Sequence, residues 1–301
     1  MNPEIRGGGT QFFHNTPESE EGMTMVTESP RIPAGTVTGE ITFMVPAEQR
    51  PYVHTEAFTG EPEPRYYAEL QRRAVTIHDA RTQAQELSLD RHGIELHRRP
   101  TIVDDLYDDA HVEQDYYQEI EALVREATGA SQVVIFDHTR RRDDGGSGGT
   151  KTPADRAHND YTEWSAPQRV RDVVGEEEAR RLRDVPFVQV NAWRPIRGPV
   201  RRSPLAVLDA ATLDAGDLIA TDMVYPGRTG EIYHLAFNPA QRWLYFPAME
   251  RDEILLIKGF DSRIDGRARF VPHTAFHDPG TRSDEPPRES IEVRTLAFFE
   301  S

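Results

Sequence analysis

Apolar residues recur with a helical period over one segment of the chain and alternate with polar residues over several others. The clearest helical pattern covers Val112–Thr128. Its apolar positions repeat so that they share one face of a helix: Tyr116, Ile120, Leu123, Val124 and Ala127. Gly129 follows at once, where a glycine commonly ends a helix. A second helix is predicted over Pro167–Arg183, and weaker helical patterns cover residues 66–73 and 79–88.

Short β-rich runs dominate the second half of the chain and are separated by Pro, Gly, Asp and Asn residues. The predicted strands are Thr36–Val45, Gln132–Phe136, Phe187–Trp193, Leu205–Asp209, Glu231–Phe237, Trp243–Phe246, Ile254–Lys258 and Ile291–Phe299. Strands at this spacing are typical of an antiparallel sandwich or barrel. The pattern therefore predicts an α+β protein, in which a helical and irregular N-terminal half packs against a β-rich C-terminal half.

Composition along the chain predicts its organisation. Residues 1–34, with clustered glycines, glutamates and prolines, are predicted to form an irregular arm, and the arginine- and glycine-rich residues 140–153 a mobile loop. Residues 35–301 are predicted to form one fused domain. Its N-terminal portion covers about 35–137, and its β-rich core about 154–301.

Composition and charge exclude several classes of protein. The chain has 301 residues, a net charge of −16 and no cysteine, which excludes disulfides, thiolate metal sites and a cysteine nucleophile. No apolar run approaches the roughly 20 residues of a membrane span, and we expect neither a membrane nor a nucleic acid as partner, since the negative charge repels phosphate. The N-terminus lacks the apolar segment of a secretory signal, so a cytoplasmic protein is expected.

One histidine and one aspartate are spaced for metal binding. His158 and Asp160 lie two residues apart, and on an extended strand they face the same side at about 6.5–7 Å between Cα atoms. With a distant histidine, they would give two nitrogens and one oxygen on one face of a metal ion. That set is the facial triad of non-haem Fe(II) oxygenases, whose open positions accept a co-substrate and dioxygen. A hydrogen-bonded loop is the alternative interpretation.

The last predicted strand has an unusually polar face. Arg288, Ser290, Glu292 and Arg294 alternate onto the same side. An arginine can bind a carboxylate through two hydrogen bonds, and a serine adds a hydroxyl donor. The pair Arg288 and Ser290 therefore suits the distal carboxylate of 2-oxoglutarate, unless this face is simply exposed to solvent.

Taken together, these features resemble the Fe(II)/2-oxoglutarate-dependent oxygenases. More specifically, the chain resembles the hydroxylase/desaturase family related to the 7α-cephem methoxylase component and to gibberellin-desaturase-like proteins. The resemblance covers about Val133 to Phe299. Its segments are Val190–Pro195, Gly198–Val200, Pro204–Ala206, Arg242–Pro247 and Pro287–Arg294.

The resemblance implies a fold and a set of ligands. The fold would be a double-stranded β-helix, the cupin-like jelly roll, with flanking helices. His158, Asp160 and His273 would hold Fe(II), and Arg288 with Ser290 would bind 2-oxoglutarate. The long interval between Asp160 and His273 leaves His234 and His277 open as the distal ligand.

Asn191 is also expected to line the site that binds the co-substrate. It shares a strand face with Phe187, Gln189 and Trp193.

The implied activity is hydroxylation, desaturation or oxidative cyclisation of a small molecule in secondary metabolism, using Fe(II), 2-oxoglutarate and dioxygen. Two alternatives stay open from the residues. One is a metal-dependent isomerase or dioxygenase of similar fold that does not use 2-oxoglutarate. The other is a non-catalytic protein that binds a small molecule. The substrate and the oligomeric state are not encoded in any motif of the sequence.

Overall fold

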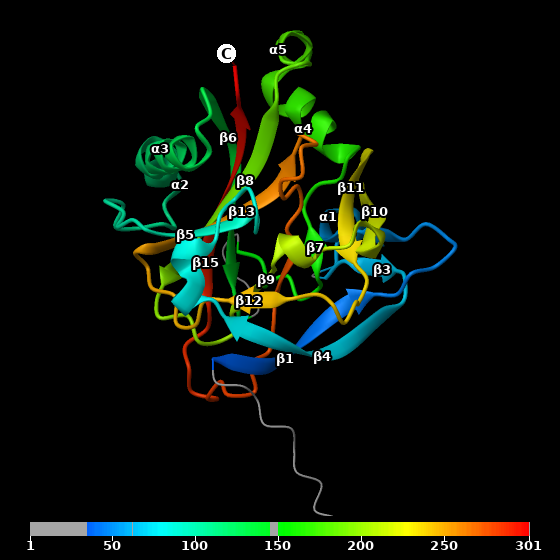
Figure 1. Ribbon diagram of the computed structural model, residues 1–301, viewed down its shortest axis with the longest axis vertical. Helices are drawn as coiled ribbons and strands as arrows, with labels where there is room; N and C mark the ends of the chain where they lie inside the picture. Colours follow the sequence, from blue (N-terminus) through cyan, green and yellow to red (C-terminus); the bar gives the residue numbers. More distant parts are fainter. Residues whose placement is uncertain (1–34, 62, 145–149, 301) are drawn as a thin grey trace, which may run out of the picture. The chain divides into compact units, whose positions relative to one another are not determined.

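The strands of the protein form two antiparallel-rich sheets, shown in Figure 1. This computed structural model describes residues 35–61, 63–144 and 150–300. The chain divides into Met1–Ile32 and Pro33–Ser301, and the described residues belong to the second unit. The arm predicted over residues 1–34 lies outside the described residues.

The smaller sheet has five strands, all antiparallel to their neighbours. Their order is β5 (Ile94–Arg98), β13 (Glu253–Asp261), β8 (Phe187–Arg197), β15 (Glu289–Phe298) and β6 (Gln132–Arg142). On β8 and β15 alternate residues face opposite sides of the sheet. One face is mainly apolar, with the buried Arg194 as an exception, while the other carries Asn191 and Arg294 side by side, because these two residues are paired across the strands.

The larger sheet has ten strands. Their order is β1 (Thr36–Met44), β4 (Leu70–Asp79), β12 (Trp243–Tyr245), β9 (Leu205–Leu208), β14 (His273–Ala275), β7 (His158–Asn159), β11 (Arg228–Leu235), β10 (Leu218–Tyr225), β2 (Tyr52–His54) and β3 (Arg65–Tyr67). The central strands β12, β9, β14 and β7 pair in antiparallel fashion.

Eight strands form the predicted double-stranded β-helix. Along the chain, β6, β7, β8 and β9 alternate between the smaller and the larger sheet, β12 stays in the larger sheet beside β9, and β13, β14 and β15 alternate again. Because most connections cross between the sheets, residues far apart in sequence meet between them. The jelly-roll prediction is thus confirmed. The hairpin β10–β11 comes between β9 and β12 in the chain and extends the larger sheet beyond β7.

Apolar side chains from both sheets meet in a shared core. This core contains Trp193, Leu255 and Ile257 of the smaller sheet with Val207 and Leu244 of the larger one. Because Val207 is paired with His273 across β9 and β14, the core side of the larger sheet also carries that histidine.

The helices lie outside the two sheets (Figure 1). They are α1 (Glu56–Thr59), α2 (Asp109–His111), α3 (Tyr117–Thr128), α4 (Ser165–Val174) and α5 (Glu176–Arg181). A π-helical turn over Val112–Tyr116 joins α2 to α3, and Gly129 ends α3 with φ 71°, as its position predicts. The apolar stripe of α3 packs on the face of β8 and β15 that carries Val190 and Val293.

The prediction of a helical N-terminal half is wrong. Residues 66–73 and 79–88 form β3, β4 and a 3-10 helix over Arg81–Glu86 instead of α-helices. In β4 the buried residues Val75 and Ile77 flank the exposed Thr76, which is the period of a strand, and β1 pairs with β4 along the whole length of β1.

The predicted loop over residues 140–153 also needs correction. The strand β6 continues to Arg142, and Arg141 pairs with both Ser290 and Lys151. Residues 145–149 lie outside the described part of the chain.

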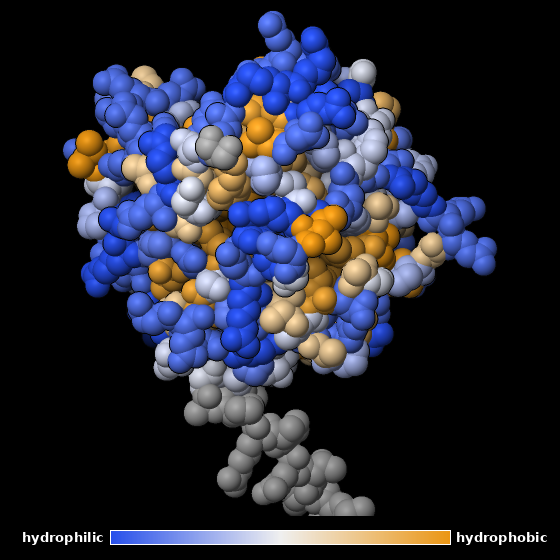
Figure 2. Space-filling view, turned by 45° about the horizontal axis from the view of Figure 1, so that its top comes forward, coloured by the Kyte–Doolittle hydropathy of each residue, from blue (hydrophilic) through white to orange (hydrophobic). Residues whose placement is uncertain are grey.

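The molecular surface agrees with the composition. On the face in Figure 2, hydrophilic residues cover most of the surface and hydrophobic side chains gather in a few patches between them. None of the helices in the described residues is long and apolar enough to cross a membrane.

Candidate active site

Two paired strands bring the predicted metal ligands together. β7 and β14 are antiparallel and pair His158 directly with His273, so both side chains lie on the same face and their rings are 4.6 Å apart. Asp160 follows β7, and its carboxylate lies close to both histidine rings. One ligand atom from each of the three residues lies within 4.8 Å of the other two.

Both imidazoles are held in one tautomer by the backbone. His158 Nδ1 is 2.8 Å from the carbonyl oxygen of Arg156, and His273 Nδ1 is 3.0 Å from that of Val271. A carbonyl only accepts, so each Nδ1 carries a proton, and in the neutral ring Nε2 is then the nitrogen with a lone pair to offer a metal. A hydrogen bond of this kind at the far nitrogen is the usual support of a metal-binding histidine.

The two oxygens of Asp160 have different surroundings. Asn191 Nδ2 donates to Oδ2 at 2.7 Å, and Arg294 Nε lies 3.7 Å from the same oxygen. Oδ1 lies 3.5 Å from His158 Nε2. Burial alone would raise the pKa of Asp160. The contact with His158 and the charge of Arg294 outweigh it and hold the pKa well below its ordinary value, so the group is an anion.

His273 is the distal histidine that the structure brings to His158 and Asp160. Burial lowers its pKa, which favours the neutral form that binds a metal. The alternatives lie elsewhere. His234 is paired with His158 across β7 and β11, but its Nδ1 contacts Thr221 Oγ1 at 3.0 Å and it lies outside the ligand cluster. His277 is exposed, and its backbone forms an isolated β-bridge with that of Glu40 in β1.

Arg288 is a buried cation without a carboxylate partner among the described residues. It is 2% exposed, its Nη1 donates to the carbonyl oxygen of Ser203 at 2.7 Å, and its Nε is buried with no hydrogen-bond partner there. The guanidinium lies 5.7 Å from the ring centroid of Trp193. Burial, together with the charge of Arg141, lowers the pKa of Arg288 to about 9. Such a group gains from a bound anion, which would compensate its charge and its orphaned donor.

The residues near Arg288 complete this side of the site. Ser290 is buried two residues further along, and Glu292 contacts Arg294 Nη2 at 3.1 Å. The sequence placed Arg294 only on a polar strand face, and gave no sign of its contact with Asp160. Ser203 was missed altogether, because nothing in its local sequence signals a contact with a residue 85 positions away.

The side chains of the site fit Fe(II) and a carboxylate-bearing co-substrate. Two imidazole nitrogens and one carboxylate oxygen on one side of a centre suit Fe(II) and leave further positions open. The buried guanidinium of Arg288 suits a carboxylate. Asn191, expected to line the co-substrate site, instead donates its amide to Asp160.

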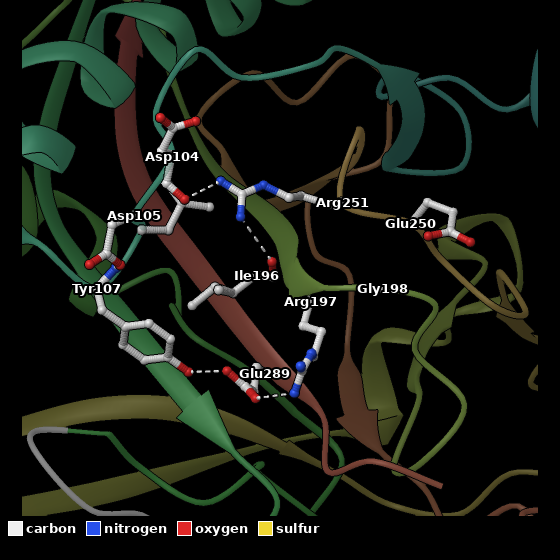
Figure 3. Close-up of a pocket in the computed structure, with 10 residues that line it drawn as sticks. Asp104, Asp105, Tyr107, Ile196, Arg197, Gly198, Glu250, Arg251 and Glu289 are labelled. Atoms are coloured by element: carbon white, nitrogen blue, oxygen red, sulfur yellow. Dashed lines mark hydrogen bonds and ion pairs between the residues drawn. The ribbon is translucent and has the colours of Figure 1, made fainter.

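A cavity lies on the side of β15 opposite to the histidine cluster. The cavity of about 580 Å³ in Figure 3 is lined by Tyr107 and Glu289, whose side chains hydrogen-bond at 2.7 Å, and by Arg197, which lies 3.8 Å from Glu289. Glu289 and Ser290 are consecutive on an extended strand, so their side chains face opposite ways. This cavity is therefore separate from the histidine cluster.

Known proteins share both the sequence and the fold. Residues 41–298 match the family described as oxidoreductase/YMDC permease-like domain. The hydroxylase/desaturase efuI of Hormonema carpetanum is 35% identical over 254 residues, which are 75% of this chain and 83% of that protein. The Fe(II)/2-oxoglutarate-dependent dioxygenase nvfI of Aspergillus novofumigatus is 35% identical over 231 residues, 74% of this chain and 82% of that protein.

A solved structure of a related enzyme has the same fold. The iron and alpha-ketoglutarate-dependent endoperoxidase NvfI superimposes with a TM-score of 0.80 at 30% sequence identity, covering 89% of this chain and 99% of that one. The relatives are oxygenases of fungal secondary metabolism, which does not favour the isomerase or the non-catalytic alternative. This chain belongs to the hydroxylase/desaturase family of Fe(II)/2-oxoglutarate-dependent dioxygenases.

Proposed function

We propose that the protein oxidises a C–H bond of a small molecule, with Fe(II) held by His158, Asp160 and His273 and 2-oxoglutarate held by Arg288 and Ser290. The observation that carries this proposal is the convergence of two histidines, each with its Nδ1 bound to a backbone carbonyl, on a carboxylate, beside a buried arginine that has no carboxylate partner among the described residues. Names of the relatives support hydroxylation, desaturation or a related oxidation as the outcome.

Dioxygen would oxidise 2-oxoglutarate to succinate and CO₂, and bound Fe(II) would couple this reaction to the oxidation of the substrate. The protein contributes the geometry. The backbone carbonyls of Arg156 and Val271 accept hydrogen bonds from the Nδ1 atoms of the two histidines, which directs both Nε2 atoms to the metal. Asn191 donates a hydrogen bond to Asp160 Oδ2. Asp160 is thereby left with Oδ1 as its free ligand atom, so ligation through one oxygen keeps positions open for 2-oxoglutarate and dioxygen.

Arg288 would orient the co-substrate. Its burial against Trp193 removes water from the guanidinium, which strengthens its attraction for a carboxylate. Arg288 Nε lacks a partner among the described residues, and Ser290 can add a hydroxyl donor. Two charge-assisted hydrogen bonds would then fix the far end of 2-oxoglutarate relative to the histidines.

We further propose that residues 35–301 act as one fused oxygenase domain, built on a β-helix core that includes β6 and so begins before the expected residue 154. Pairing between strands from the two ends of this range supports the proposal, since β6 pairs with β15 and β4 pairs with both β1 and β12. The absence of cysteine agrees with the cytoplasmic location expected for the protein.

Dioxygen-dependent formation of succinate from 2-oxoglutarate tests the proposal, with Fe(II) binding measured in parallel under anaerobic conditions. His158→Ala and His273→Ala are expected to lose stoichiometric Fe(II), whereas His234→Ala retains it because His234 lies outside the cluster. Arg288→Ala is expected to keep Fe(II) and to lose affinity for 2-oxoglutarate by about 30-fold or more, the scale for truncating a buried charge partner. Full Fe(II) binding by His273→Ala, or unchanged 2-oxoglutarate affinity in Arg288→Ala, would contradict these assignments.

A further inference from the structure

The guanidinium of Arg288 is oriented by a residue from another part of the chain. Ser203 lies just before β9, and its carbonyl oxygen accepts the 2.7 Å hydrogen bond from Arg288 Nη1. Among the described residues, this is the hydrogen bond that the guanidinium makes. The position of the Ser203 carbonyl therefore decides where the remaining donors of Arg288 point.

The backbone of Ser203 is in a conformation that its own residue type disfavours. Its φ is 46°, in the left-handed region, which non-glycine residues rarely adopt. Pro204 follows, and a proline restricts the conformations of the residue before it. Such a conformation persists only where surrounding contacts hold it.

Asp143 supplies those contacts. Ser203 Oγ donates to Asp143 Oδ2 at 2.6 Å, and Arg202 Nε lies 2.8 Å from the same oxygen. Asp143 also reaches Arg288 itself, since its backbone N–H donates to the carbonyl oxygen of Arg288 at 3.0 Å. One residue at the end of β6 thus fixes both the main chain of Arg288 and the serine that holds its side chain.

We propose that Asp143, acting through Ser203, is a positioning residue that sets the orientation of Arg288 and with it the affinity for 2-oxoglutarate. This inference rests on the proposed function, in which Arg288 binds the distal carboxylate. Asp143 does not touch the co-substrate in this arrangement. Its role is to keep the Ser203 carbonyl on Nη1, so that Nε and the rest of the guanidinium face the anion.

Charge and positioning make opposite predictions for Asp143. The charged groups near Arg288 are Arg141, Asp143 and Glu292. If Asp143 acted only as a negative charge, its removal would strengthen binding of the anionic 2-oxoglutarate. If Asp143 acts by holding Ser203, loss of the hydrogen-bond acceptor weakens binding instead. Asparagine separates the two effects, because its amide oxygen still accepts from Ser203 Oγ without the charge.

The experiment measures the affinity for 2-oxoglutarate by anaerobic titration calorimetry on the Fe(II)-loaded protein. Asp143→Ala is expected to bind about tenfold more weakly, the scale on which loss of an outer supporting partner acts. Asp143→Asn is expected to bind as tightly as the wild type or more tightly. Asp144→Ala is the matched control, because Asp144 is the next acid in the chain and pairs with Arg142 at 2.5 Å instead.

Ser203→Val tests the same contact from the other side. A β-branched residue resists a positive φ, so the carbonyl would move and 2-oxoglutarate binding is expected to weaken at least as much as in Asp143→Ala. Fe(II) affinity, measured on the same samples, is expected to stay unchanged in all these variants. A general loss of structure would weaken both affinities together.

The outcomes separate this inference from the proposed function. If Arg288→Ala weakens 2-oxoglutarate binding while Asp143→Ala binds like Asp143→Asn, the proposed function stands and the positioning role is refuted. If Arg288→Ala itself binds 2-oxoglutarate normally, the proposed anchor is wrong, and the positioning role falls with it. Weaker binding in Asp143→Ala alone among the Asp143 and Asp144 variants supports the inference.

Discussion

Asn191 provides the sharpest test of how the metal site is supported. It is buried, and its amide donates to Asp160 Oδ2 at 2.7 Å. Replacing it by leucine keeps a side chain of similar volume but removes the donor from an ionised acceptor. A hydrogen bond to a charged group contributes about 1.5–3 kcal/mol. Arg294 Nε, 3.7 Å from the same oxygen, still attracts it, so the lower half of that range applies.

This free energy converts to a measurable change in metal affinity. Since about 1.4 kcal/mol corresponds to a tenfold change in a binding constant, Asn191→Leu is expected to raise the Kd for Fe(II) about 10- to 40-fold. The range agrees with the roughly 10- to 100-fold losses that follow removal of an outer hydrogen bond to a metal ligand. Anaerobic competition with a coloured chelator measures the Kd without any need for the substrate.

Gln189 offers a matched control on the same strand. It lies two residues before Asn191 on the same face of β8 and is equally buried. Its amide has no hydrogen-bond partner among the described residues. Gln189→Leu is therefore expected to leave the Fe(II) affinity unchanged and the fold at least as stable. Unchanged affinity in Asn191→Leu, or an equal loss in Gln189→Leu, would refute the reasoning.

Three further predictions concern stability. Burial alone would raise the pKa of Asp261, but the hydrogen bond from Arg263 and the charge of Lys258 outweigh it and lower the pKa. Asp261→Asn leaves buried Lys258 with the exposed Asp90, 3.3 Å away, as its remaining carboxylate partner, so a cost of about 3 kcal/mol is expected in urea unfolding at neutral pH. Because the folded pKa is lowered, this difference is complete above the ordinary carboxyl pKa of about 4 and shrinks as the pH falls below it; a difference independent of acid pH would contradict the assignment. Gly93→Ala adds a methyl group 2.2 Å from a side-chain carbon of Val271 at a φ of 73°, so a loss of about 1–3 kcal/mol is expected in the same assay, and a neutral effect would show that the site relaxes freely. Fe(II) at about 100 times its Kd is expected to stabilise the fold by about 2.7 kcal/mol in thermal unfolding, reversibly on chelation, whereas no shift would argue against a metal site.

The sequence by itself determined the features that depend on neighbouring residues. The helical period of Val112–Thr128 and the glycine that ends it predict α3, because a helix is built from contacts between residues three and four apart. Alternation predicts β8 and β15 in the same way. The spacing of His158 and Asp160 puts two ligands on one side for a similarly local reason.

Where local patterns were weak, the tertiary structure decided instead. Residues 66–73 carry charged residues and few large apolar ones, so their helical pattern was faint. They form β3 and the first part of β4, because β2 offers β3 a partner and β1 offers β4 one. Pairing between distant strands supplies hydrogen bonds that no local window of sequence contains.

The identity of the distal histidine likewise depends on the tertiary structure. His234, His273 and His277 were all compatible with the spacing. The strand pairing puts both His273 and His234 beside His158, but the ring of His273 contacts that of His158, whereas Nδ1 of His234 contacts Thr221 Oγ1 and His234 lies outside the ligand cluster. The contacts of Asn191 with Asp160 and of Ser203 with Arg288 arise in the same way. Sequence periodicity predicts which side of a strand a residue faces, but only the packing of the two sheets determines which partner it meets there.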